Sequence, residues 1–224
     1  CHTHVAYRDL DPTFYDALFA RARGEKVSVP ATLIAALSLA FAEREHHERP
    51  SRDAYHVLPH VTVDLRSRYA KRVAHGDLGV HISTVDPCVT VAADRLADAD
   101  SSLLFDVARS VRAEMQEKLR AGVDRHFLGA LVAGMGLLLP HVVPDRSFGT
   151  FIFTDAAAFA VPPTLGGFEV ESVSALANCR GQSLPYVVTA RSSRQTRISM
   201  MAPTPAFDPS DLEALLDAAV AHLE

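Results

Sequence analysis

Two histidine–aspartate spacings are the first features of this sequence that could do chemistry. His60 and Asp64 stand four residues apart, as do His141 and Asp145. In acyl transfer a histidine can remove the proton of an attacking hydroxyl group while an aspartate holds the geometry of the site. With 11 histidines in the chain, two such spacings are close to chance expectation. On a strand, His60 and Asp64 would share a face but lie about 13 Å apart, so the spacing alone does not predict a catalytic pair.

Metal and thiol chemistry have weaker candidates. The run Cys1-His2-Thr3-His4 could bind a metal at a free terminus, but strand alternation explains it better. His46 and His47 stand in the charged stretch 43–50, which we expect to be a solvated loop. No base neighbours Cys88 or Cys179 in the sequence, so inert thiols are expected there. Three sparse cysteines exclude paired zinc motifs and favour a reducing cytoplasm.

Several function classes lack their signals. The run Gly134-Met135-Gly136 lies in an apolar stretch without dinucleotide-binding spacing, and no Gly-x-Ser-x-Gly motif is present. The net charge is -5 and no basic run stands out, so neither nucleic acid nor an anionic membrane is expected as a partner. Apolar stretches are interrupted before the roughly 20 residues that a membrane-spanning helix needs. The remaining function classes are those of a globular protein that acts on smaller molecules or binds other proteins.

Periodicity and capping residues predict the elements that must position any site. Strands are expected at 2–8, 57–66, 78–84, 148–153, 168–174, 184–191 and 196–202, and helices at 12–24, from 30 onward, 101–122, 127–139 and from 209 onward. This order predicts an α+β domain whose mixed β-sheet is covered by helices. The chain also opens inside an alternating run, so we expect it to be part of something longer.

Three stretches carry a family resemblance. They are Val27-Ser28-Val29-Pro30-Ala31-Thr32-Leu33-Ile34-Ala35-Ala36-Leu37, Val61-Thr62-Val63-Asp64-Leu65-Arg66 and Phe151-Ile152-Phe153-Thr154-Asp155-Ala156. A hairpin and a helix that begins at Pro209 follow the third. In this order the three stretches resemble the C-terminal half of condensation-domain-like acyltransferases. The polyketide-associated acyltransferases, typified by mycobacterial phthiocerol dimycocerosyl transferase, are the most similar members.

The resemblance implies a chloramphenicol acetyltransferase-like fold with two lobes and a tunnel between them. Family members carry the signature His-His-x-x-x-Asp-Gly on the N-terminal lobe, where the second histidine acts as the base. The acceptor then attacks a thioester presented by coenzyme A or a carrier protein, and neither a metal nor an organic redox cofactor takes part. The signature is absent from this sequence. We therefore expect residues 1–224 to be the C-terminal lobe, with the N-terminal lobe as its essential partner.

The resemblance also implies roles for four residues. Arg66, supported by Asp64, would hold the signature aspartate of the other lobe as an ion pair, since a guanidinium can bind a carboxylate with two hydrogen bonds. Thr154 and Asp155 would bind substrate, with the hydroxyl donating to the developing oxyanion. A surface arginine at a strand end and an ordinary strand-terminal turn are the structural alternatives. Residues 127–139 and 161–167 could line an acyl chain, although core packing and a plain loop explain them better.

The predicted function is transfer of an acyl group from a coenzyme A or carrier-protein thioester to a hydroxyl, less readily to an amine. The acceptor would be a secondary metabolite or a lipid, and the enzyme would be cytoplasmic. An alternative is a non-catalytic lobe that docks a carrier protein or another subunit. A third interpretation makes His60 or His141 the base of a complete small hydrolase or transferase.

Overall fold

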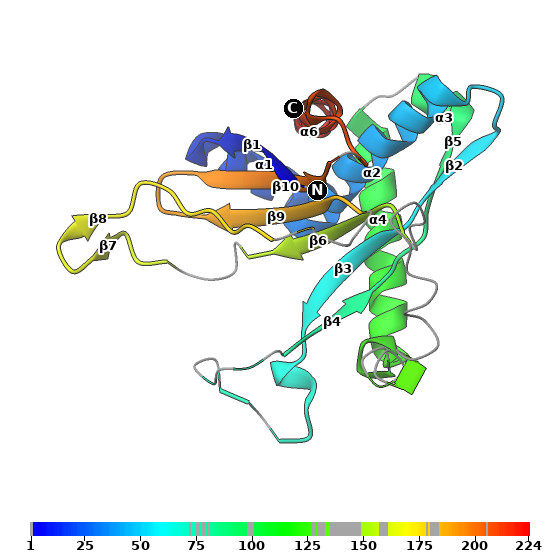
Figure 1. Ribbon diagram of the computed structural model, residues 1–224. Helices are drawn as coiled ribbons and strands as arrows, with labels where there is room; N and C mark the ends of the chain where they lie inside the picture. Colours follow the sequence, from blue (N-terminus) through cyan, green and yellow to red (C-terminus); the bar gives the residue numbers. More distant parts are fainter. Residues whose placement is uncertain are drawn as a thin grey trace.

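The architecture is a mixed β-sheet covered by helices, as the sequence predicts (Figure 1). The computed structural model describes residues 2–71, 73–74, 77, 79, 81–97, 101–126, 129, 133–134, 149–156, 161–177, 179, 184–204 and 206–224. The main sheet runs in the order β1 (Thr3–Leu10), β10 (Thr196–Pro203), β9 (Tyr186–Arg191), β6 (Phe151–Asp155), β3 (Pro59–Asp64) and β4 (Ile82–Val85). The strands β3, β6 and β9 are parallel, and the outer pairs are antiparallel.

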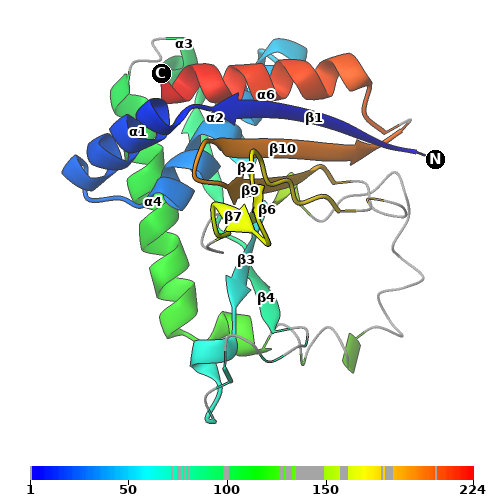
Figure 2. The same ribbon diagram turned by 90° about the vertical axis from the view of Figure 1, so that its left-hand side faces the viewer.

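Helices and short strands complete the chain. The helices are α1 (Pro12–Gly24), α2 (Val29–Glu48), α3 (Ala93–Ala97), α4 (Ser101–Arg120) and α6 (Pro209–Leu223), with the 3₁₀ turn η1 (Arg66–Arg68). Two small ladders pair β2 (Ala54–Val57) with β5 (Val89–Ala92), and β7 (Thr164–Leu165) with β8 (Phe168–Glu169). The hairpin β7–β8 projects from the body (Figure 1), and α6 lies over β1 (Figure 2).

Helix starts follow the capping residues of the sequence. The carboxylate of Asp11 accepts hydrogen bonds from the backbone N–H groups of Thr13 and Phe14, at 2.8 and 3.0 Å, and Pro12 follows it. Asp208 likewise accepts from the N–H of Ser210 at 2.9 Å. These bonds satisfy backbone N–H groups of the first turn, which have no partner within the helix. A proline at the first helical position has no N–H group, so it costs the helix no internal hydrogen bond. The predicted starts of α1 and α6 are therefore confirmed.

The core lies between the helices and one face of the sheet. Helix α2 is buried all round from Ala31 to Ala42, because α6 and α4 flank it while the sheet lies beneath. The rings of Phe41 and Phe151 stack at a centroid distance of 5.3 Å. Burying a phenylalanine side chain contributes roughly 1.5–3 kcal/mol, so this contact ties α2 firmly to β6.

The charged stretch 43–50 was expected to be a solvated loop, and this prediction is wrong. Most of the stretch forms the last turns of α2. Arg44 pairs with Glu48 one turn later at 3.0 Å and with Asp211 of α6 at 2.7 Å. His46 Nδ1 lies 2.8 Å from the hydroxyl oxygen of Tyr55 on β2. Contacts with other elements thus extend the helix, where the composition alone favoured a solvated loop.

Several strands differ from their predicted bounds. The expected strand 57–66 is divided between β2 and β3, because β2 pairs with β5 while β3 pairs with β4 and β6. The expected strand 78–84 coincides with β4 over residues 82–84, while residues 78 and 80 lie outside the described residues. The expected strand 168–174 is a strand only over β8. The predicted helix 127–139 lies mostly outside the described residues.

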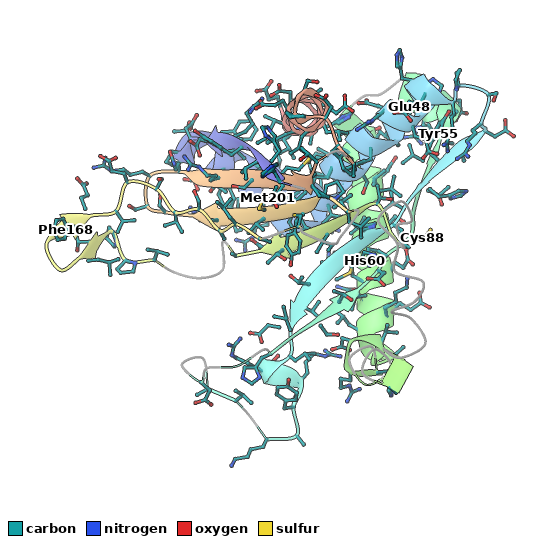
Figure 3. The ribbon with its side chains drawn as sticks, in the orientation of Figure 1. Glu48, Tyr55, His60, Cys88, Phe168 and Met201 are labelled. Carbon is teal, nitrogen blue, oxygen red and sulfur yellow. The ribbon has the colours of Figure 1, made fainter. Side chains whose placement is uncertain are left out.

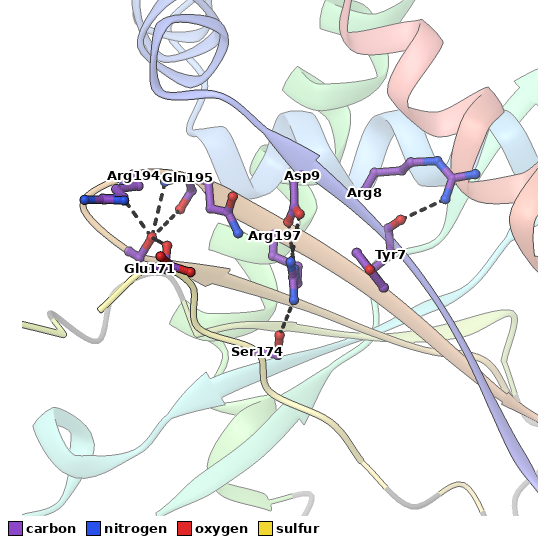
Figure 4. A network of polar contacts seen from close by, with 9 residues as sticks. Tyr7, Arg8, Asp9, Glu171, Ser174, Arg194, Gln195 and Arg197 are labelled. Atoms are coloured by element: carbon purple, nitrogen blue, oxygen red, sulfur yellow. Dashed lines mark hydrogen bonds and ion pairs between the residues drawn. The ribbon is translucent and has the colours of Figure 1, made fainter. Parts of the chain in front are cut away.

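Ser174 and Cys179 contact the face of the sheet opposite the helices. Arg197 on β10 donates to both carboxylate oxygens of Asp9 at 2.7 Å and to Ser174 at 2.8 Å (Figure 4). Its guanidinium also lies 4.3 Å from the ring centroid of Tyr7. Cys179 packs with Val188 and Met201 in a small second cluster. These contacts cover the β1, β10 and β9 side of this face.

No single helix in the described part of the chain is both long and apolar enough to cross a bilayer. Helices α1 and α2 are long and apolar enough only when taken together, and a bend of 98° separates them.

Candidate functional site

Thr154 lies in a row of hydroxyl groups on the face of the sheet opposite the helices. Alternation along β6 buries Phe151 and Phe153 in the core and turns Thr154 to the other face. The parallel register brings Thr62 of β3 alongside, and its Oγ1 donates to Thr154 Oγ1 at 3.2 Å. Thr154 Oγ1 in turn donates to the hydroxyl oxygen of Tyr186 on β9 at 3.4 Å. The predicted residue therefore has two hydroxyl partners that sequence reasoning did not single out as site residues.

Arg66 follows the end of β3 and opens the turn η1. Its backbone N–H donates to Asp64 Oδ1 at 2.9 Å, and its Nη1 lies 3.2 Å from the same oxygen. The Arg66 side chain is 18% exposed against 47% for Asp64. Within the described residues, Arg66 Nε is buried without a hydrogen-bond partner. The arginine side chain is therefore mostly covered, and one of its donors makes no hydrogen bond within the described residues.

The side chain of Asp155 does not lie on the same face of the sheet as that of Thr154, because successive residues of a strand point to opposite faces. Its Oδ1 accepts a hydrogen bond from Thr189 of β9 at 2.6 Å, on the side that packs against the helices. Burial raises the pKa of Tyr15 on α1, and the negative charge of Asp155 raises it further. The guanidinium of Arg191 lies 4.3 Å from the Tyr15 ring centroid. The structure thus separates the two predicted substrate-binding residues.

His60 does not pair with Asp64. Its Nδ1 lies 2.8 Å from Asp86 Oδ1, and its ring packs against Gly149, where a Cβ atom would stand 2.2 Å from Nε2. Figure 3 shows His60 on β3. The second ring nitrogen therefore faces backbone, which disfavours His60 as a catalytic base. The other spacing, His141 to Asp145, lies outside the described residues.

The remaining candidates have local structural roles. Cys179 is buried, and that burial raises the pKa of its thiol. Cys88 is exposed, and its backbone N–H donates to Glu114 at 2.9 Å. Within the part of the chain that the structure describes, no three His, Cys, Asp or Glu side chains gather as a metal site requires.

One open depression of the described surface lies away from the predicted site residues. This depression of about 340 Å³ has Arg44, His56 and Phe207 on its walls, and neither Thr154 nor Arg66 lines it. Thr154 is only half-buried on its face of the sheet.

Comparisons with known proteins identify the fold. The chain superposes on trichothecene 15-O-acetyltransferase from Fusarium sporotrichioides with a TM-score of 0.80 and 11% identity, covering 100% of this chain and 46% of that one. Polyketide synthase associated protein 5 from Mycobacterium tuberculosis gives a TM-score of 0.68 and 19% identity, covering 99% and 53%. The condensation domain of the monacolin K polyketide synthase gives 0.65 and 14%, covering 99% and 46%. The chain thus spans about half the length of these proteins.

Sequence comparison adds the family. No curated protein sequence matches this chain. A family model described as the phthiocerol/phthiodiolone dimycocerosyl transferase C-terminus matches residues 3–208, which is most of the chain. The architecture agrees with that of condensation-domain-like acyltransferases. The chain belongs to the phthiocerol/phthiodiolone dimycocerosyl transferase C-terminus family and is a C-terminal lobe of the condensation-like acyltransferase type.

Proposed function

We propose that this chain is one lobe of an acyltransferase that moves an acyl group from a thioester to a hydroxyl. The observation that carries the proposal is the family match over residues 3–208. The donor would be acyl-coenzyme A or an acyl carrier protein, and an alcohol of a lipid or secondary metabolite would be the acceptor, in the cytoplasm. An amine is the less favoured acceptor.

The reaction needs a base for the acceptor hydroxyl. An imidazole of the other lobe would take the proton of the acceptor hydroxyl as its oxygen bonds to the thioester carbon. The carbonyl electron pair then moves to the oxygen, and an O–H donor stabilises that charge. Collapse of this intermediate breaks the carbon–sulfur bond and expels the thiolate, which takes up the proton. The sequence has no His-His-x-x-x-Asp-Gly signature, so the other lobe is proposed to supply the base.

Arg66 would contribute by holding a carboxylate of the other lobe. Its mostly buried guanidinium and its unpartnered Nε, within the described residues, support this role. A buried cation keeps a nearby carboxylate ionised and fixes its direction. Asp64 would in turn orient the guanidinium through the contact at 3.2 Å.

The tip of the hairpin β7–β8 supports a contact with a second lobe. Phe168 is 80% exposed and Leu165, its neighbour in the ladder, is 55% exposed (Figure 3). Two large apolar side chains on a projecting hairpin favour burial against another surface. We propose that this surface belongs to the lobe that carries the base.

Mass spectrometry tests the function. A polypeptide containing both lobes is incubated with acyl-coenzyme A or acyl carrier protein and a panel of alcohols and amines. An ester whose formation requires the protein supports the proposal, and an amide would change the acceptor class. The alternative is a non-catalytic lobe that docks a carrier protein, and the missing signature is the observation that favours it. This docking role applies if neither product forms while the immobilised lobe retains a carrier protein.

A further inference from the structure

Three arginines line an open hollow at the end of α4, the arginine depression. Its walls are Arg68, Gln116, Leu119, Arg120 and Arg125, and its volume is about 470 Å³. Gln116 and Arg120 share a face of α4, with Arg120 Nη2 3.5 Å from Gln116 Oε1. Arg68 comes from the turn η1, which lies beside the end of this helix (Figure 2). Segments distant in the sequence thus bring three guanidinium groups together.

Two of these guanidinium groups meet on the same turn of backbone. Arg68 Nη2 donates to the Leu119 carbonyl oxygen at 2.6 Å, and the backbone N–H of Gly122 donates to the same oxygen at 3.2 Å. Gly122 has a φ of +75°, and a Cβ atom there would stand 2.9 Å from Arg125 Nη2. The guanidinium of Arg125 therefore lies against the bare Cα of Gly122, and the two cations flank the turn that ends α4.

The arginine depression has an excess of positive charge. Asp124 pairs with Arg68, but its carboxylate is completely buried and Arg68 contacts both of its oxygens. Within the described residues, no carboxylate forms an ion pair with Arg120 or Arg125. Both of these arginines are exposed, so their charges face the depression and the solvent. The cations on the walls therefore outnumber the one buried anion.

Stabilisation of the helix end does not account for this cluster. A cation near the C-terminus of a helix interacts favourably with the helix dipole, and Arg68 already supplies one at the Leu119 carbonyl. Further guanidinium groups without a carboxylate repel one another. Elsewhere this acidic chain, with a net charge of -5, balances such groups, since Arg8 and Arg109 each pair with two carboxylates. Uncompensated positive charge at one hollow therefore indicates an anionic ligand.

Phosphate is the anion that suits these walls. A guanidinium group can form two parallel hydrogen bonds with phosphate oxygens. Arg68 binds Asp124 and Leu119 through Nε and Nη2, so within the described residues its Nη1 remains for a ligand. Leu119 is the one apolar side chain on the walls, so an apolar ligand would gain little burial there. Several cations match coenzyme A, which carries several phosphate groups, better than the single phosphodiester of a carrier-protein arm.

We propose that the arginine depression binds the phosphate groups of a coenzyme A donor. The inference rests on the proposed acyltransferase function and chooses between the two donor classes that this function leaves open. The turn η1 that supplies Arg68 also carries Arg66, which is proposed to meet the other lobe. The phosphates would therefore bind next to the junction of the two lobes.

Calorimetric binding of coenzyme A to the polypeptide with both lobes tests the inference. The variant Arg120→Gln/Arg125→Gln removes two exposed charges and leaves the buried pair of Arg68 intact. Its affinity for coenzyme A should fall about tenfold or more, because charge-assisted hydrogen bonds are lost. Affinity for pantetheine, which carries no phosphate, should not change. Arg23→Gln is the matched control, since Arg23 is an exposed arginine on α1.

Steady-state kinetics add a readout that a merely structural role would not give. Phosphates remote from the reacting carbonyl bind equally in the ground state and the transition state. The double variant should therefore raise KM for acyl-coenzyme A about tenfold with kcat within about threefold. Arg120→Lys/Arg125→Lys should recover only part of the affinity, because it keeps the charges without the planar hydrogen bonds.

Three results would overturn the inference. The first is parental affinity for coenzyme A in Arg120→Gln/Arg125→Gln, and the second is an equal loss of affinity for pantetheine. The third is a variant that keeps its affinity for coenzyme A but loses that for a phosphopantetheinylated carrier protein. In that case the arginine depression serves the carrier protein instead.

The same measurements separate this inference from the proposed function. If coenzyme A binding depends on Arg120 and Arg125 but neither ester nor amide forms, the phosphate site stands and the proposed function fails. If acyl transfer occurs and the double variant binds coenzyme A as tightly as the parent protein, only the phosphate site fails.

Discussion

Arg68 and Asp124 form an ion pair in which the carboxylate is completely buried. Arg68 Nε lies against Asp124 Oδ2, Nη2 is 3.2 Å from Oδ1, and the same Nη2 donates to the Leu119 carbonyl at 2.6 Å. The pair joins the turn η1 to the segment that follows α4, and it holds the backbone that carries Arg66 two residues earlier.

Removing the cation of this pair should destabilise the lobe strongly. Arg68→Met leaves the Asp124 carboxylate buried without its partner, which costs about 3–5 kcal/mol in free energy of unfolding. Urea unfolding of the lobe measures the loss. The double variant Arg68→Met/Asp124→Leu removes both charges and should recover most of the stability. A double variant as unstable as the single one would show that the charges are not the cause.

Arg66→Ala should lower the activity of the two-lobed protein at least tenfold, because a carboxylate of the other lobe would lose its partner. Arg66→Lys should restore little, since an ammonium group cannot reproduce the planar hydrogen bonds of a guanidinium. Turnover is compared with that of Arg23→Ala, an exposed arginine on α1. Normal turnover together with a normal melting temperature for Arg66→Ala would refute the role assigned to Arg66.

Gly149→Ala should destabilise the fold by about 1–3 kcal/mol, the usual range for overpacking. A Cβ atom at this position would stand 2.2 Å from His60 Nε2 and 2.9 Å from the Leu58 carbonyl oxygen. Adding His60→Ala should recover part of the loss, while the backbone contact keeps the rest. Gly24→Ala is the control, since a Cβ atom there meets nothing within 4 Å. Equal thermal stability of Gly149→Ala and the parent protein would contradict the packing.

Acid should weaken α6 through its cap. A hydrogen bond from the Ser210 hydroxyl, with a further one from the Ser210 backbone N–H, holds the pKa of Asp208 below its usual value. The stability contributed by the carboxylate is therefore fully present above the unfolded pKa of about 3.9, and is lost as pH falls through the lower folded value.

The variant Asp208→Asn tests this dependence, because asparagine caps a helix about as well but does not titrate. The free energy of unfolding is measured at pH 6 and pH 3. The parent should lose more stability between these two values than Asp208→Asn does. Identical losses in both proteins would mean that the cap does not titrate in this range.

Local interactions could be predicted from the sequence. The pairs Asp11-Pro12 and Asp208-Pro209 mark helix starts, because a cap and its helix are neighbours in the chain. Alternation along a strand likewise predicts that His60 and Asp64 share one face of the sheet. The family resemblance that implied one lobe of an acyltransferase also came from ordered local stretches, and the family match confirms it.

Contacts between distant residues were decided only by the tertiary structure. The hydroxyl groups of Thr62 and Thr154 are in contact although the residues are 92 positions apart in the chain. Thr154 and Tyr186, which are also in contact, are 32 positions apart. The pairing of His60 with Asp86 in place of Asp64, and the helical end of α2, likewise depend on elements brought together by packing. Periodicity reports which face a residue occupies, whereas strand order and register determine which residue lies beside it, and these follow from burying the whole sheet against its helices.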